Sequence, residues 1–121
     1  MLVGSVTIEQ KKYWNLLCSE VGCIACMKEG NPNDWVSIHH IEGRTKKDAH
    51  WLVLSLCASH HQDNGMAIAV HPYKKRFENR YGNQYQLMSD SVSILKRRNI
   101  EVPKRVVELI DEFIFKGRIA A

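Results

Sequence analysis

Apolar residues recur at helical intervals over the first part of the chain. Thr7 stands just before the first of them, as a helix N-cap does, and Gly22 stands just after the last. The apolar positions that share this face are Ile8, Tyr13, Leu16, Leu17 and Val21. The spacing predicts an amphipathic helix over residues 7–21.

Two later segments alternate between apolar and polar residues, as strands with one buried face do. They are residues 35–41 and 50–56, and a polar stretch with three cations, residues 42–48, joins them. We therefore expect a β-hairpin. Successive side chains of a strand point to opposite sides, so we expect His39 and His40 to have different roles.

Helical patterns return in the second half of the chain. Pro72 suits the first turn of a helix over residues 71–80, and Gly82 suits its end. Two more helices are expected near residues 84–95 and 103–115. The apolar face of the last one is made of Val106, Val107, Ile110 and Phe113 or Ile114. A hairpin with helices on both sides in the sequence indicates the α+β class.

Length and charge narrow the possibilities further. The 121 residues are 45% apolar and 25% charged, so we expect residues 1–121 to form a single domain. A core of this size is small, and a structural metal would supplement it. The net charge of +4 suits a polyanionic partner. No apolar run approaches the roughly 18 residues that cross a bilayer, so we expect no membrane association.

Three of the four cysteines stand with a histidine in metal-ligand spacings. Cys23 and Cys26 form a CxxC motif, and Cys57 and His60 form a CxxH motif further along the chain. These four ligands predict a closed tetrahedral site for a structural Zn²⁺ in a reducing compartment. The alternative is a set of buried, unliganded thiols with a surface histidine. Cys18 lies outside the spacing and is expected to be a small core residue.

Three more histidines, His39, His40 and His61, remain beside the expected hairpin. One imidazole of a strand pair can hold a cation while its neighbour deprotonates water. Metal-assisted phosphodiester hydrolysis needs this division of labour. The alternative for His39 and His40 is an exposed pair on an edge strand, and an incidental role is equally open for His61.

Several spaced motifs resemble those of the HNH, or ββα-metal (His-Me finger), endonucleases. They are the Ile-His-His-Ile segment at 38–41, the Leu-x-Leu-Cys-x-x-His-His segment at 54–61 and the flanking CxxC. Within that superfamily, the chain resembles the phage recombination-enhancement (Ref) nuclease family through segments 21–26, 38–46, 56–61, 70–71 and 77–82. The resemblance implies a ββα-metal nuclease core over residues 13–88, held by the structural zinc, and a C-terminal helical extension over residues 89–121.

The resemblance also implies a DNA endonuclease that uses one divalent ion. It assigns His40 as the general base, His39 and His61 as ligands of the ion, and His71 as a third ligand or a phosphate contact. Imidazole ligands accept Mg²⁺, Mn²⁺, Ni²⁺ or Zn²⁺, so the choice of ion stays open. Ref-type proteins act with RecA filaments at displacement loops. DNA and RecA are therefore the implied partners, and a bacterial or phage-infected cytoplasm is the implied location.

Cations near these histidines are candidate phosphate contacts. Arg44, Lys46 and Lys47 crowd the expected hairpin loop, and Arg76 belongs to a cationic helix after His71. Contacts of this kind bind DNA without reading its sequence. The alternative is a solvated charged face.

One position departs from the HNH motif. The middle Asn is absent, and His50 or Trp51 stands at its usual strand position, so the motif does not identify the residue that orients His40. A nearby dication should lower the pKa of His40, and we expect activity to fall below about pH 6 to 7. Trp14 and Trp35, like Trp51, are expected to pack in the core or against the hairpin.

Two other functions are compatible with these residues. One is a zinc-ribbon-like DNA-binding or adaptor module that does not cut, and the other is a toxin-type nuclease with an immunity partner. The adjacent pair His39 and His40 argues against the first, because a binding module has no use for a general base.

Overall fold

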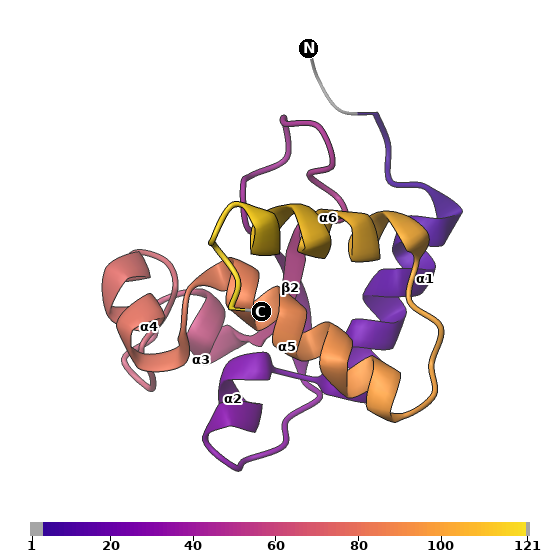
Figure 1. Ribbon diagram of the computed structural model, residues 1–121. Helices are drawn as coiled ribbons and strands as arrows, with labels where there is room; N and C mark the ends of the chain where they lie inside the picture. Colours follow the sequence, from indigo (N-terminus) through magenta and orange to yellow (C-terminus); the bar gives the residue numbers. More distant parts are fainter. Residues whose placement is uncertain (1–3, 121) are drawn as a thin grey trace.

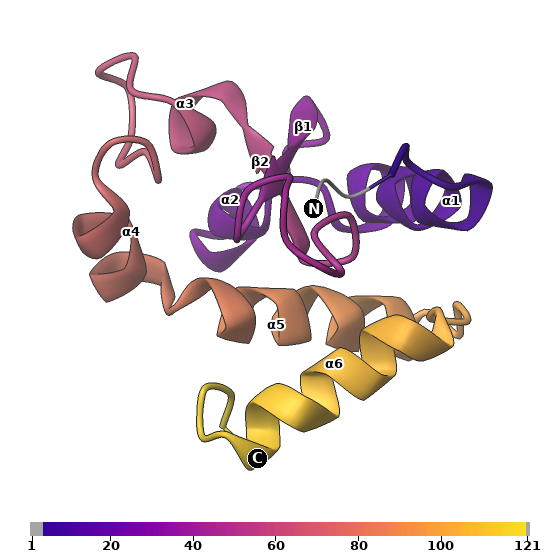
Figure 2. The same cartoon turned by 90° about the horizontal axis from the view of Figure 1, so that it is seen from above.

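The computed structural model describes residues 4–120, in which a two-stranded antiparallel hairpin lies among helices (Figures 1 and 2). The fold is therefore mixed α+β. In chain order the elements are α1 (Ile8–Leu16), a π-helical turn (Leu17–Val21), α2 (Ile24–Lys28), β1 (Val36–His40), β2 (Val53–Cys57), α3 (Ala58–His61), α4 (Lys74–Tyr81), α5 (Gln84–Arg97) and α6 (Lys104–Phe115).

The first helix begins at the expected N-cap. The Thr7 hydroxyl accepts a hydrogen bond from the Gln10 backbone N–H at 3.1 Å, and the Gln10 side chain accepts one from the Thr7 N–H at 2.8 Å. The expected α-helix to residue 21 is wrong in its last part, because residues 17–21 form a π-helical turn. The Gly22 N–H donates to the Leu17 carbonyl and ends that turn.

The hairpin forms as predicted but its strands are shorter. His39 lies opposite Leu54, and His40 lies opposite Val53. The second strand begins at Val53 rather than residue 50, because the N–H groups of residues 51 and 52 both donate to the Asp48 carbonyl and form a turn. Every residue of β2 is buried, so this strand lies inside the core.

The C-terminal helices form a layer against the hairpin. In the view of Figure 2, α5 runs beneath the hairpin, and α6 packs on the other side of α5. The buried side of α6 contains Val106, Ile110 and Phe113 as expected, with Leu109 in place of Val107. No helix within residues 4–120 has both the length and the apolar character needed to cross a membrane.

Two further expectations are wrong. The helix after Pro72 begins at Lys74 rather than at residue 71, and the segment before it runs beside α3, where the N–H groups of Val70 and His71 donate to the carbonyls of residues 60 and 61. Trp35 does not pack in the core, since 87% of its surface is exposed at the start of the hairpin. The other two tryptophans are partly buried against the core.

Candidate functional site

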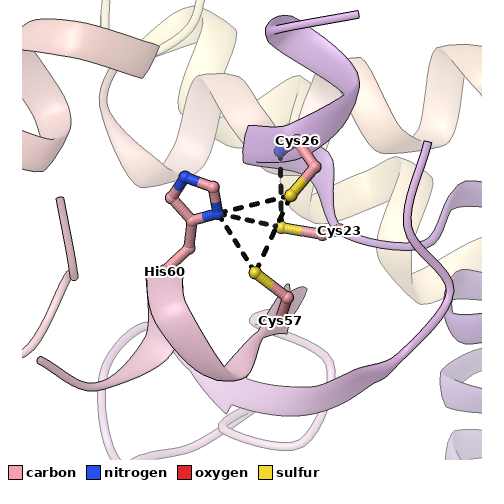
Figure 3. Close-up of side chains that lie close together, drawn as sticks. All are labelled: Cys23, Cys26, Cys57 and His60. Atoms are coloured by element: carbon pink, nitrogen blue, oxygen red, sulfur yellow. Dashed lines mark hydrogen bonds between the residues drawn. The ribbon is translucent and has the colours of Figure 1, made fainter. Parts of the chain in front are cut away.

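The CxxC and CxxH motifs meet in the protein interior (Figure 3). Cys23 is the N-cap of α2 and Cys26 lies in that helix, while Cys57 ends β2 and His60 lies in the short helix α3 that follows. All four side chains are buried. Two segments far apart in the sequence are thus joined at one point.

The spacing of the four ligand atoms fits one tetrahedral ion. His60 Nδ1 lies 3.5 Å from the Cys23 Sγ, 3.5 Å from the Cys26 Sγ and 3.2 Å from the Cys57 Sγ. The sulfurs of Cys26 and Cys57 are 3.7 Å apart. Zinc bonds of about 2.3 Å to sulfur and about 2.0 Å to nitrogen imply edges of roughly 3.5 to 3.8 Å in a tetrahedron. The cluster is therefore consistent with a structural zinc site.

The surroundings of the cluster also suit a bound cation. Burial raises the pKa of the Cys23 thiol to about 12, so a thiolate at this position needs a cation in direct contact. The second ring nitrogen of His60 lies 2.9 Å from the Tyr81 hydroxyl and 3.3 Å from a Glu29 carboxylate oxygen. Such contacts to the outer nitrogen orient a ligand imidazole.

A second histidine cluster lies at the other side of α3. One ring nitrogen from each of His39, His61 and His71 falls within 4.8 Å of the other two. His39 comes from β1 and is buried, and His61 comes from α3 directly after the zinc-cluster residue His60. His71 is placed by backbone pairing, since its N–H donates to the His61 carbonyl at 3.2 Å. The group can hold a metal ion through three imidazoles.

This second cluster opens into a cleft with a volume of about 580 Å³. His40 lines the same cleft, and so do two cationic side chains, Arg44 and Lys74. The cleft therefore offers a cation site, a further imidazole and positive charge within one open hollow. A phosphodiester needs all three when it is hydrolysed with the help of a metal.

Two histidines of the second cluster, the buried His39 and the partly buried His61, are oriented by hydrogen bonds. His39 Nε2 lies 2.7 Å from the Gln84 side-chain oxygen, and the Gln84 amide nitrogen donates to Glu78 at 3.0 Å. His61 Nδ1 lies 3.0 Å from the Ser37 hydroxyl. Each imidazole thus uses one nitrogen for a protein partner and keeps the other available for an ion.

His40 occupies a different environment from its neighbour. Its Nε2 lies 3.0 Å from His50 Nδ1, and the Trp14 ring packs edge-on against it at 5.4 Å between centroids. Burial, together with the smaller effect of the positive charge of Arg44, lowers the pKa of His40 to about 4. The pKa of His40 is lowered, as expected from the sequence. Its value of about 4 lies below the pH of 6 to 7 at which the sequence predicted that activity would start to fall. His40 is thus a neutral base over a wider pH range.

Comparison with protein families identifies the chain. Residues 6–96 match the family model of the recombination enhancement, RecA-dependent nucleases. The chain belongs to this family. It is therefore a nuclease that hydrolyses DNA phosphodiester bonds in recombination and depends on RecA. The alternative of a zinc-ribbon-like module that does not cut is wrong.

The candidate phosphate contacts of this RecA-dependent nuclease do not all lie at the cleft. Arg44 lines it, whereas Lys46 and Lys47 are exposed on the adjoining hairpin loop. Arg76 lies over the Tyr73 ring, 5.4 Å from its centroid, and borders a different hollow. Lys74 takes the place in the cleft that the sequence suggested for Arg76.

Some residues of the nuclease site carry no signal in the sequence. Gln84, Glu78 and Ser37 orient the histidines only because distant elements meet, and Gln84 is 45 residues away from its partner His39 in the sequence. His50 did carry a signal, because it stands near the position where HNH motifs have Asn. The motif alone did not show that His50 contacts His40.

Proposed function

We propose that this nuclease is a single-metal ββα-metal endonuclease with two separate ion sites. Cys23, Cys26, Cys57 and His60 would hold a structural zinc, and His39, His61 and His71 would hold the catalytic divalent cation. The order β1, β2, α3, with ligands on the first strand and on the helix, supports a ββα-metal core.

The observation that carries the proposal is the cleft itself. Three imidazole nitrogens lie within 4.8 Å of one another at the wall of the cleft. His40, which is not part of this cluster, lines the same cleft. When bound there, a divalent cation such as Mg²⁺, Mn²⁺, Ni²⁺ or Zn²⁺ would neutralise phosphate charge and stabilise the leaving oxygen. A cation can approach His71 and the cleft freely, because His71 is exposed.

His40 would act as the general base. Its lowered pKa keeps the imidazole neutral near pH 7, so it can accept a proton from the attacking water. Arg44 and Lys74 line the cleft and would bind the phosphates that flank the cut. Lys46, Lys47 and Arg76 would contact the DNA backbone further away. None of these contacts reads bases, so we expect low sequence specificity.

A nicking assay on supercoiled DNA, with and without a RecA filament, tests this function. His40→Ala should reduce cleavage to a small residual rate while zinc content and divalent-cation binding remain as in wild type. His39→Ala should abolish both cleavage and cation binding at the second site, measured by isothermal titration. A fully active His40→Ala protein would refute the general-base assignment, and unchanged cation binding by His39→Ala would refute the ligand assignment.

A further inference from the structure

His50 connects the imidazole of His40 to the start of the described chain. It is buried, with 6% of its surface exposed, in the turn before β2. Its Nδ1 lies 3.0 Å from His40 Nε2, and its Nε2 lies 3.2 Å from the Gly4 carbonyl oxygen. Its own carbonyl accepts a hydrogen bond from the Trp14 indole at 2.8 Å. Both ring nitrogens of His50 therefore have a partner.

The Gly4 carbonyl determines where the protons lie in this chain of contacts. A carbonyl oxygen only accepts, so His50 Nε2 must carry a proton and donate it. A neutral imidazole then has its lone pair on Nδ1, and the group 3.0 Å away, His40 Nε2, must be the donor. His40 consequently has its proton on Nε2 and its lone pair on Nδ1.

We propose that His50 is the positioning residue of the general base, which accepts the Nε2–H of His40 and so makes Nδ1 of His40 the atom that takes the proton from water. This role rests on the proposed function of His40.

The surrounding packing holds the two rings in this arrangement. His40 and His50 stand edge-to-face, with 5.2 Å between centroids and an interplanar angle of 81°. Trp14 contacts both rings edge-on, at 5.4 Å from His40 and 5.8 Å from His50. A rotation of either ring would break contacts with the indole as well as the hydrogen bond. The acceptor is thus fixed before DNA binds.

Two substitutions of His50 distinguish the loss of its hydrogen-bond acceptor from the loss of its packing. His50→Asn keeps an oxygen at the position of Nδ1, whereas His50→Leu removes the acceptor, and both lose the contact with Gly4. We expect His50→Leu to lower the single-turnover nicking rate roughly 10- to 100-fold, and His50→Asn to stay close to wild type. Equal rates for the two variants, when both are folded, would overturn the proposal.

A double variant tests whether His50 acts through His40. Adding His50→Leu to His40→Ala should not lower the residual rate further, because the residue that it positions is already absent. A further loss as large as that in the wild-type background would overturn the proposal. If His40→Ala itself is fully active, the general-base assignment fails instead, so the two failures are distinguishable.

A measurement on the unmodified protein covers the case in which both His50 variants fail to fold. Nitrogen-15 correlation spectra of the zinc-loaded full chain, labelled at histidine, distinguish protonated from unprotonated ring nitrogens. We expect His40 near neutral pH to carry its proton on Nε2 and none on Nδ1. A proton on Nδ1 of His40 would overturn the proposal, whatever the variants show.

Discussion

Gly22 is the position where one added methyl group should disturb the zinc cluster most. Its backbone has φ +70° and ψ −149°, a conformation that side-chain-bearing residues rarely adopt. A Cβ on Gly22 would lie 2.4 Å from the Asn33 carbonyl oxygen and 3.1 Å from its carbon. That same oxygen accepts the N–H of Cys23, a member of the Cys3His cluster, at 2.7 Å. Relief of the clash therefore has to move backbone that holds the cluster.

The cost of Gly22→Ala has two parts. The backbone conformation contributes about 1 to 3 kcal/mol, and an overpacked contact with backbone contributes about 1 to 3 kcal/mol more. Gly30 provides a matched control, since it has φ +76° but nothing within 4 Å of its added Cβ. Gly30→Ala should cost only the left-handed backbone penalty of about 1 to 2 kcal/mol. The difference between the two variants measures the clash together with any extra backbone strain at Gly22.

Urea unfolding of the zinc-loaded variants, followed by tryptophan fluorescence, checks these magnitudes. A competition titration with a zinc chelator measures the affinity of the Cys3His cluster in parallel. We expect the unfolding midpoint to fall more for Gly22→Ala than for Gly30→Ala, and zinc affinity to fall about tenfold or more only for Gly22→Ala. Equal midpoints and equal zinc affinities in the two variants would refute the reasoning.

Three further predictions concern the second cluster and the hairpin loop. Gln84→Leu should weaken divalent-cation binding at the histidine cluster about 10- to 100-fold while zinc content is unchanged, because His39 loses the acceptor that orients it; unchanged cation affinity in a titration would contradict this. Asp48→Asn should lower the free energy of unfolding at pH 7 by about 1 kcal/mol, since it breaks a bidentate ion pair with Arg105 at 2.8 and 3.1 Å. Asn tolerates the positive φ of this position, so an unchanged urea midpoint would mean that the pair contributes nothing. Nuclease activity at saturating cation should stay level from about pH 7.5 to about pH 5.5 and fall only towards pH 4, because the lowered pKa of His40 keeps the base neutral until then. A loss centred near the ordinary histidine pKa of about 6.5 would argue against this base.

The predictable parts of the fold are those that the sequence encodes locally. The capping box at Thr7 and the glycine at position 22 involve residues next to one another in the chain. The zinc cluster was predictable for a related reason, since CxxC and CxxH each place two ligands in one turn. Only the contact between the CxxC turn and the CxxH turn depends on the fold. Four ligands that suit one ion make this contact favourable.

The parts that could not be predicted depend on contacts between distant segments. The turn at residues 48–52 uses N–H groups that the predicted second strand would need. The β-rich composition of residues 50–56 gave no sign of this turn. Gln84 acts on His39 only because the start of α5 lies against β1. Trp35 is a large apolar residue of a type common in protein cores, but it lies exposed to solvent at the start of the hairpin. In each case the tertiary arrangement overrides a local preference.

His60 and His61 are consecutive residues of α3, yet they face different clusters. In the proposed two-ion arrangement, zinc would tie α3 to the start of α2 and so fix the position of the helix that carries His61. Removal of zinc should therefore also weaken cation binding at the second cluster. Assembly would then follow an order, with the structural ion bound first and the catalytic cation second.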